Sequence, residues 1–403
     1  MVKQAIKKGS TIKKKAGFGA FKDKTGMTDV NANLALSNAD KPLEWLVMPK
    51  GFQDATRLVG FPCGYVSMIG GFSDSGKSTI LGHIIVASQR QGFATVIYDT
   101  ENSLDWTYLK NMGFDAQPVY GDVNVEKVDE NGDVYIGTDK RIINYTNDND
   151  DFLYFNNTIL AERYGQNDYS TGKETKATKR KTAVIEDIAA SIKEILKAQE
   201  EGVINQGIVF VWDSIGSINS FKSYKSPTNN NMFDAGSVSV SFSDILNNLI
   251  PSSRKVSAKY TNTFVAVSKI WLDSMTAPMA APIVKYKNGN TFFYACHGII
   301  CHVGGALTSG TKKLKATSKN AVYKYGMETK IKVVKSHLPS PYDITYEGPM
   351  ICTSHGIIAE DELTKYQKEH VKDMLEQLNN ILAESGESAT EEDVVFIEDT
   401  EED

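Results

Sequence analysis

Residues 64–79 have the sequence GYVSMIGGFSDSGKST, in which an apolar run leads through a glycine-rich turn into a helical pattern. The turn contains the P-loop pattern Gly71-x-x-x-x-Gly76-Lys77-Ser78. Its glycines let successive backbone N–H groups face an anion, and a helix beginning near Lys77 points its positive end at the same place. An expected strand before the turn and an expected helix after it supply the context that the motif requires. The sequence therefore predicts a nucleotide site.

The P-loop predicts ATP and Mg²⁺ as ligands. Lys77 offers a positive charge to the β and γ phosphates, and the Ser78 hydroxyl is suited to hold Mg²⁺. A second apolar run, residues 207–212, ends at Asp213, as a Walker B element requires, and Asp213 is the second expected Mg²⁺ residue. The residues expected around the nucleotide phosphates are Gly71, Phe72, Ser73, Asp74, Ser75, Gly76, Lys77, Ser78 and Thr79.

The composition is that of a soluble globular protein: 403 residues, of which 41% are hydrophobic and 23% charged, with a net charge of −6. No apolar run reaches the length of about 18 residues that a membrane span needs. The four cysteines are too few and scattered for a disulfide framework, which favours a reducing, cytoplasmic compartment.

The two ends carry opposite charge. Residues 1–24 contain eight lysines and one aspartate, and residues 384–403 contain ten acidic residues and no basic one. Such ends either contact a polyanion or neighbouring copies of the chain, or are solvated and disordered.

Strand and helix patterns alternate between these ends and predict an α/β fold: a mostly parallel twisted sheet with helices on both faces. We expect strands at 65–69, 94–98, 207–212, 262–268, 292–303 and 329–334, and helices at 79–90, 104–112, 182–201, 242–250 and 361–383. We divide the chain into a basic N-terminal extension that is a candidate oligomerisation arm (1–50), an ATPase core (51–358) and a C-terminal helix with an acidic disordered tail (359–403). Residues 119–181, which include a hairpin around 129–133, are expected to form an insertion outside the core.

Glu101 follows the strand after the P-loop helix. A carboxylate there is placed to polarise the water that attacks the γ phosphate. The alternative is an acidic residue that only stabilises the start of the next helix.

Several motifs together resemble the bacterial RecA recombinases and their phage relatives of the UvsX type. These motifs are Gly60–Gly64 before the P-loop strand, Val96–Asp115 with Glu101, Leu104, Asp105, Tyr108 and Gly113 in order, Asp213-Ser214-Ile215, and Lys332–Lys335. The resemblance extends from about Gly51 to Ile358 and implies a RecA-like P-loop NTPase core.

The resemblance also implies roles for single residues. Glu101 is then the catalytic glutamate, Asp105 and Tyr108 lie against the adenine, and Lys335 reaches the ATP of a neighbouring protomer in a helical filament. Two loops, near residues 222–236 and 273–291, are then expected to bind single-stranded DNA; without the resemblance they would be ordinary surface loops. Their candidate DNA contacts are Lys222, Lys225, Asn229, Asn230, Lys285, Lys287, Gly289 and Asn290.

Two positions depart from the family pattern. Lys269 stands where the family has a polar γ-phosphate sensor, and it either contacts that phosphate, as a catalytic cation, or points away. His337 stands where a second interface lysine is expected, which leaves activation across the interface to Lys335.

Two further patterns have competing interpretations. Cys296-His297 and Cys301-His302 suggest zinc, but alternation along a strand would point them to both faces, so we favour buried cysteines. The basic run Lys173, Lys176, Lys179, Arg180 and Lys181 either guides duplex DNA or is a solvated loop, which we favour.

These features predict a DNA-dependent ATPase that forms a filament on single-stranded DNA and pairs it with homologous duplex DNA in recombination and repair. Single-strand-binding or loader proteins are compatible partners, and the setting is the cytoplasm of a bacterial cell or a phage-infected host. The alternatives are a hexameric helicase or translocase of the same fold, and a non-catalytic DNA-binding protein switched by ATP.

Overall fold

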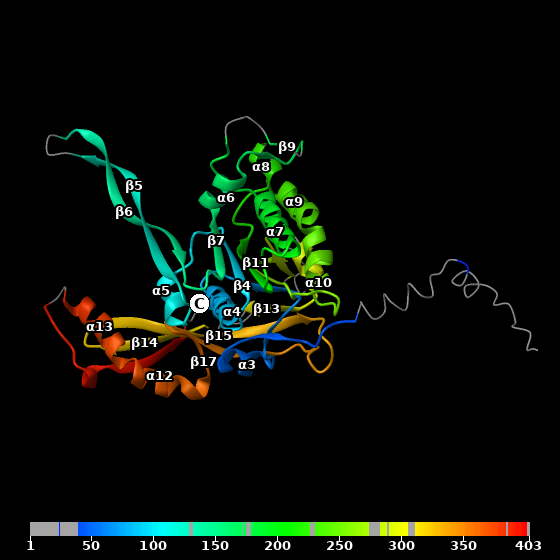
Figure 1. Cartoon of the computed structure of the whole chain (residues 1–403). Helices are drawn as coiled ribbons and strands as arrows, with labels where there is room; N and C mark the ends of the chain where they lie inside the picture. The colour runs from blue at the N-terminus through cyan, green and yellow to red at the C-terminus, as the bar shows by residue number, and fades with distance from the viewer. Residues whose placement is uncertain are drawn as a thin grey trace, which may run out of the picture.

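The computed structural model describes residues 24, 39–128, 132–171, 173–174, 179–225, 230–273, 283–287, 290–304, 311–383 and 386–400. At its centre is a large mixed sheet with the strand order β17-β16-β15-β13-β3-β11-β10-β4-β7 (Figure 1). The six strands from β13 to β7 run parallel, which confirms the predicted α/β class. They are β13 (Ile299–Val303), β3 (Val66–Gly71), β11 (Thr263–Asp273), β10 (Ile208–Ile215), β4 (Ala94–Asp99) and β7 (Phe152–Asn156).

Alternate residues of these strands belong to two hydrophobic cores, one on each face of the sheet, because successive side chains of a strand point to opposite faces. Ile69, Ile97 and Val211 pack on one face, under α3 (Lys50–Thr56), α4 (Lys77–Arg90) and α5 (Trp106–Asn111). Met68 and Tyr98 pack on the other face, under α7 (Ile185–Glu200) and α9 (Asn230–Asp244). Burial on both faces explains the nearly continuous apolar runs of these strands.

The antiparallel side of the sheet continues into a C-terminal layer. Its strands are β15 (Ala321–Ser336), β16 (Glu347–Thr353), β17 (Gly356–Ile358) and β14 (Lys312–Ser318). A third core lies between these strands and the helices α12 (Leu363–Glu369) and α13 (Val371–Leu382). The single helix expected over 361–383 is therefore two helices, which meet at His370.

The acidic C-terminal segment is not a free tail over its described part, contrary to the prediction. β18 (Val395–Thr400) pairs antiparallel with the lysine-rich strand β14, and Phe396 packs against Tyr325 with ring centroids 5.8 Å apart. Alternating apolar residues, Val395 and Ile397 on one side and Phe396 on the other, give this short run the pattern of a strand.

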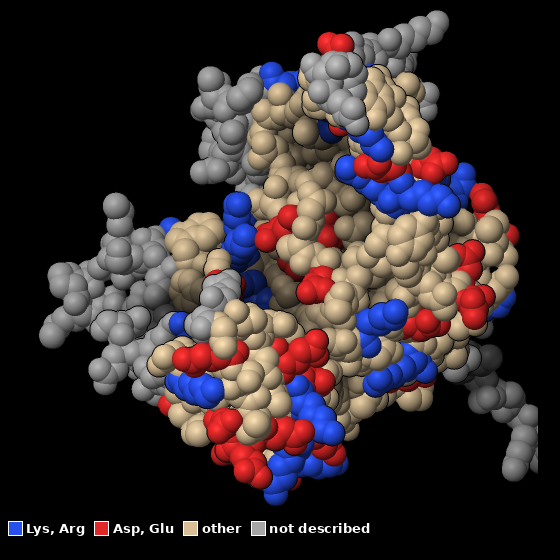
Figure 2. Space-filling model, turned by 90° about the vertical axis from the view of Figure 1, so that its left-hand side faces the viewer, with Lys and Arg blue, Asp and Glu red and all other residues tan. Residues whose placement is uncertain are grey.

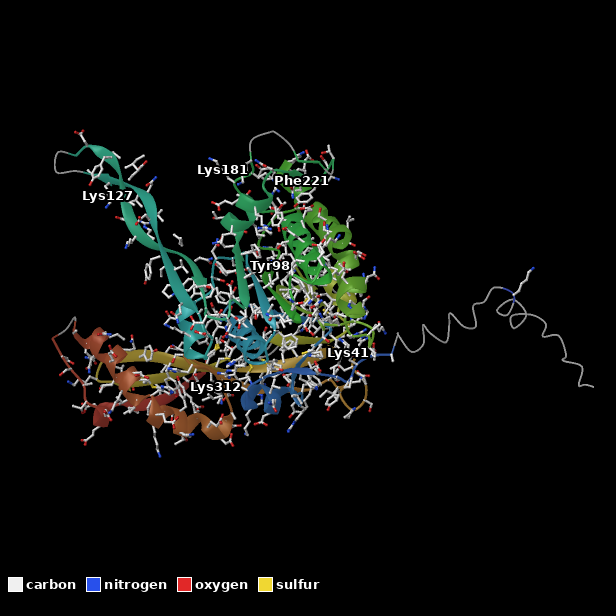
Figure 3. The ribbon with its side chains drawn as sticks, in the orientation of Figure 1. Lys41, Tyr98, Lys127, Lys181, Phe221 and Lys312 are labelled. Carbon is white, nitrogen blue, oxygen red and sulfur yellow. The ribbon has the colours of Figure 1, made fainter. Side chains whose placement is uncertain are left out.

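The expected insertion at 119–181 divides into two parts. β5 (Gln117–Val128) and β6 (Val134–Thr146) form a long antiparallel ribbon that projects from the body, so that Lys127 on it lies far from Tyr98 in the sheet (Figure 3). Residues 152–156, in contrast, are β7, the edge strand of the central sheet, and α6 (Asn157–Tyr164) follows it. The prediction that all of 119–181 lies outside the core is therefore wrong for β7.

Three smaller boundaries also differ from the expectation. Residues 292–295 belong to the helix α11 (Thr291–Ala295), and only 299–303 form the strand. The core begins before residue 51, because β1 (Trp45–Val47) pairs with β2 (Gly60–Pro62) and buries Leu46. The helix expected at 242–250 begins earlier, as α9, and continues through a π-helical turn at Ile245–Leu249 into α10 (Ile250–Ser252).

Candidate active site

The P-loop lies between the end of β3 and the start of α4, and its two glycines are required by geometry. A Cβ at Gly71 would lie 2.6 Å from both the Val303 carbonyl oxygen and the Ser75 hydroxyl. Gly76, the residue before α4, has a φ of 97°, at which a residue with a side chain would be strained. The loop therefore has the tight turn into a helix N-terminus that phosphate binding needs.

Lys77 and Ser78 open α4 and face different surroundings. Lys77 is buried, and its ammonium group donates a hydrogen bond to the Phe72 carbonyl. Burial lowers the pKa of Lys77, while the carboxylates of Asp213 and Glu101 act in the opposite direction. Ser78 is exposed, so its hydroxyl is open to a ligand.

Asp213 lies near the end of β10, opposite Asp99 at the end of β4. Burial, followed by the nearby charges of Glu101 and Asp99, raises the pKa of Asp213 to about 7. A divalent cation would relieve this accumulation of acidic groups, so the chemistry of the site fits the Mg²⁺ expected at Asp213 and Ser78.

Glu101 lies in the loop after β4 and has donors on both carboxylate oxygens. The Ser214 hydroxyl donates to Oε1, and the Lys269 ammonium lies 3.0 Å from Oε1 and 3.1 Å from Oε2. Burial favours the neutral acid, but these donors outweigh it and hold the pKa of Glu101 below its usual value. Glu101 is thus a carboxylate, close enough to Asp213 to influence its ionisation.

Asp99 positions this loop, a role that the sequence did not reveal. Its carboxylate accepts the backbone N–H groups of Ser103 and Leu104, both at 3.0 Å, and the hydroxyl of Tyr154 at 3.0 Å. Tyr154 belongs to β7, so the edge strand helps to hold the loop that carries Glu101. The available signal was a second aspartate at the end of a strand, Asp99, at the position on β4 that Asp213 occupies on β10.

Comparison with known proteins agrees with this geometry. The RecA N-terminal domain family matches residues 47–130, which include the P-loop, Asp99 and Glu101. This part of the chain is therefore similar to the RecA N-terminal domain. Protein RecA of Thermotoga petrophila is 36% identical over 99 residues, which are 22% of this chain and 27% of that protein. Protein RecA of Aquifex aeolicus is 37% identical over 78 residues, 18% of this chain and 23% of the relative. Protein RecA of Mesomycoplasma hyopneumoniae (strain 7448) is 31% identical over 138 residues, 32% and 36% of the two chains. The matches thus span between about a quarter and a third of the length of these relatives.

The two residues that the RecA resemblance assigns to adenine lie on and before α5. Asp105 caps this helix by accepting the Tyr108 N–H at 3.0 Å, and it is exposed. The Tyr108 hydroxyl donates to Thr79, in the first turn of α4, at 2.9 Å, and to the Thr353 carbonyl at 3.0 Å. Tyr108 is therefore tied directly to the helix that follows the P-loop.

Lys335 lies away from the P-loop of its own chain. It pairs with Ile300 near the start of β13, whereas Val303 at the end of β13 pairs with Gly71. Its ammonium donates to the Phe293 carbonyl at 2.6 Å, and burial lowers the pKa of Lys335. His337, two residues later, is exposed.

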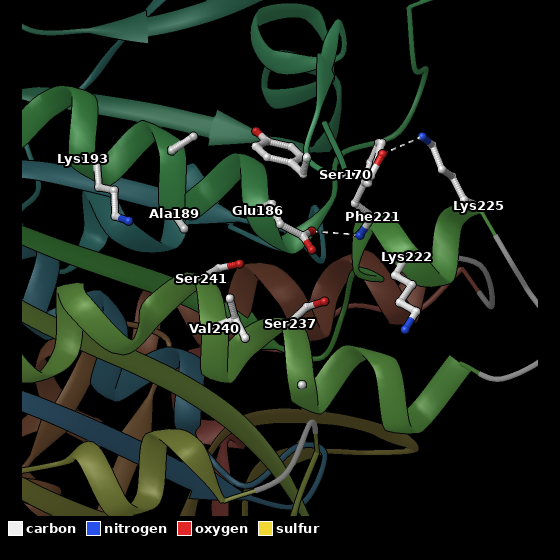
Figure 4. A pocket seen from close by; sticks show the side chains of 13 residues that line it. Ser170, Glu186, Ala189, Lys193, Phe221, Lys222, Lys225, Ser237, Val240 and Ser241 are labelled. Atoms are coloured by element: carbon white, nitrogen blue, oxygen red, sulfur yellow. Dashed lines mark hydrogen bonds between the residues drawn. The ribbon is translucent and has the colours of Figure 1, made fainter. Parts of the chain in front are cut away.

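The first expected DNA loop is largely helical. α8 (Phe221–Lys225) and residues 236–241 of α9 flank a cavity of about 900 Å³ that Tyr169, Glu186 and Lys193 also line (Figure 4). Lys222 is exposed on α8, and Lys225 forms an ion pair with Asp168 at 3.0 Å. Asn229 lies outside the described residues, and Asn230 is described only as the first residue of α9.

The second expected DNA loop contains a strand, β12 (Ile283–Tyr286), which pairs antiparallel with the end of β11. Lys285, Lys287 and Asn290 are exposed on or beside it, near the P-loop end of the sheet. Gly289 lies outside the described residues.

Basic and acidic side chains are interspersed over the face that Figure 2 shows.

Packing accounts for the two cysteines and for Arg180 of the basic run, in which Lys179 and Lys181 are exposed and Lys176 lies outside the described residues. Cys296 and Cys301 are buried in different cores, on opposite faces of the sheet. Within the described part of the chain, the residues grouped closely enough to hold a metal ion are instead His355, His370 and Asp373. Arg180 is not a DNA contact: it is buried, and its guanidinium binds Asp187 with contacts of 2.7 and 2.9 Å.

A search of the described helices for membrane-spanning segments finds none with the necessary length and hydropathy.

Proposed function

We propose that this chain is an ATP-dependent recombinase that assembles on single-stranded DNA. One observation carries the proposal: the P-loop, Glu101 and Asp213 lie at the carboxyl ends of the parallel strands β3, β4 and β10. β10 lies beside β4, and β11 lies between β10 and β3. In α/β proteins, ligands bind outside the carboxyl ends of the parallel strands. The similarity of residues 47–130 to the RecA N-terminal domain makes ATP hydrolysis coupled to DNA the activity that best fits this arrangement.

Each residue has a distinct task in the proposed hydrolysis. The P-loop N–H groups and Lys77 bind the phosphates. Ser78 and Asp213 would hold Mg²⁺, which would supply positive charge to neutralise the phosphates. Glu101 orients a water molecule and accepts its proton as the water oxygen attacks the γ phosphorus. The bond from that phosphorus to the bridging oxygen breaks, which gives ADP and inorganic phosphate.

The DNA and assembly parts of the proposal rest on the same similarity to the RecA proteins. Lys222, Lys285 and Lys287 are exposed to solvent. Exposed positive charges of this kind bind the phosphate backbone of single-stranded DNA. Lys335 cannot easily serve its own P-loop, and this supports a role at the ATP of a neighbouring protomer in a filament. Homologous duplex DNA is then the second substrate, and the cytoplasm of a bacterial or phage-infected cell the expected setting.

Turnover with and without single-stranded DNA tests the enzymatic part. We expect DNA to stimulate phosphate release, and Glu101→Gln to lower kcat by about 10²- to 10⁴-fold, because the base is lost while the fold is kept. Glu162→Gln, an exposed residue of α6, is the matched control and should retain normal turnover. Normal turnover in Glu101→Gln would contradict the assignment of the base.

A further inference from the structure

The strongest unexplained contact in the site is the one between Lys269 and Glu101. The ammonium group bridges both carboxylate oxygens, at 3.0 and 3.1 Å, and the Ser214 hydroxyl also donates to one of them. A carboxylate with donors on both oxygens is poorly placed to take a proton from water. In this state, therefore, the proposed base is engaged by a residue of its own chain.

Lys269 lies beside the phosphate loop as well as beside the base. In the parallel ladder between β11 and β3 it pairs with Gly71, the first residue of the P-loop. Its charge is close enough to lower the pKa of Lys77. Lys269 on β11 and Lys77, the first residue of α4, thus both lie beside the place where the phosphates are expected.

The ion pair is also accessible enough to be exchanged. The side chains of Lys269 and Glu101 are 44% and 23% exposed. Ion pairs with this degree of solvent contact are generally weak, whereas a terminal phosphate carries more negative charge than a carboxylate. An arriving γ phosphate therefore competes well for the ammonium group.

We propose that Lys269 is an ATP sensor that exchanges partners: it holds Glu101 when the γ phosphate is absent and releases it to bind that phosphate. Glu101 is thereby available as a base only when the γ phosphate is present, because it becomes available only when Lys269 has moved. Lys269 positions the base in one state and contacts the substrate in the other. This inference rests on the proposed ATPase function and adds the residue that couples the nucleotide state to the base.

A double-mutant cycle on nucleotide affinity tests the exchange without relying on turnover. The affinities of the full chain for a non-hydrolysable ATP analogue and for ADP are measured in wild type, Glu101→Gln, Lys269→Gln and the double variant. In Glu101→Gln we expect about five-fold tighter binding of the analogue, because Lys269 no longer has a competing carboxylate. In the Lys269→Gln background the same change should alter the affinity less than two-fold, and ADP binding should respond less than two-fold to either change.

Lys197→Gln is the matched control, because Lys197 forms an ion pair with Glu201 on α7 at 3.7 Å, outside the site. It should leave both affinities unchanged. An equal effect of Glu101→Gln in both backgrounds would show only the removal of a negative charge and would overturn the exchange. A wild-type chain that binds no nucleotide would overturn the proposed function, and this inference with it.

Discussion

At the scale of single residues, His83 makes the stability of the protein depend on pH. It is buried in α4 and its Nε2 accepts the Ile357 N–H at 2.7 Å, which requires an unprotonated nitrogen. Burial, with a smaller effect of Arg90, lowers the pKa of His83 to about 4. The unfolded chain, with a histidine pKa near 6.5, binds more protons between these values, so stability falls as the pH falls from about 6.5 towards 4.

The prediction for His83 is a loss of about 2 kcal/mol of unfolding free energy between pH 7 and pH 5. His302, whose pKa burial also lowers to about 4, adds a similar loss. Urea unfolding at the two pH values should therefore show a smaller loss in His83→Gln than in wild type, since Gln supplies an acceptor that does not titrate. Equal losses in the two proteins would contradict the assignment.

The sequence predicted individual site residues best where a residue type and a strand ending coincide. Lys77, Ser78, Glu101 and Asp213 were predicted in this way. The structure brings the charges of Lys77, Glu101 and Asp213 close enough to interact, and the roles of all four residues stay predictions. The sequence left open which way Lys269 points, because its partner lies 168 positions away along the chain. Asp99 was missed because its function depends on Tyr154, a residue of a strand that the sequence did not reveal.

At the scale of elements, a buried ion pair fastens the segment before α7 to that helix. The Asp187 carboxylate pairs with the Arg180 guanidinium. It also accepts hydrogen bonds from the Val184 N–H at 2.9 Å and from the Tyr169 hydroxyl at 2.8 Å. Removing one member of a buried pair leaves an uncompensated charge.

We therefore expect Arg180→Ala to cost about 3–5 kcal/mol of unfolding free energy, measured by urea denaturation. Arg163→Ala breaks an exposed pair with Glu194 and should cost less than about 1 kcal/mol. A cost for Arg180→Ala as small as that of its control would show that the pair does not stabilise the fold.

The β5–β6 ribbon, in contrast to this buried ion pair, is exposed to solvent. Its apolar residues Val128, Val134 and Ile136 are more than 60% exposed, so its outer part contributes little to a core. Asp122 pairs with Lys140, so replacing residues 123–139 by Asn-Gly joins the strands in register through a two-residue turn. We expect the unfolding free energy of this shortened chain to stay within about 0.5 kcal/mol of wild type. A larger loss would mean that the ribbon supports the core.

Element types were predictable wherever periodicity was strong, as for β3, α4, α7 and β10. Residues 152–156 were assigned to an insertion because the polar segments around them mask a short strand. Residues 292–295 were assigned to a strand because an aromatic-rich run has the composition of one. β18 was assigned to a disordered tail because its acidic neighbours dominate the composition. In each case the deciding contact is tertiary.

At the scale of the whole molecule, the sheet separates two chemical regions. The P-loop, Glu101 and Asp213 lie at one edge, whereas Lys335 is bound to the Phe293 carbonyl nearer the other end of β13. A head-to-tail arrangement of copies brings such different surfaces together, and it generates an open helix unless the rotation closes into a ring. The proposal of a filament rests on this separation together with the similarity of residues 47–130 to the RecA N-terminal domain.

Negative-stain electron microscopy shows whether the chain assembles into filaments on single-stranded DNA. The full chain is imaged with single-stranded DNA and a non-hydrolysable ATP analogue, and again without the nucleotide. If the chain is an ATP-dependent recombinase, we expect regular helical filaments on the DNA that disappear when the nucleotide is left out. Closed rings, or separate particles that ignore the DNA, would contradict it.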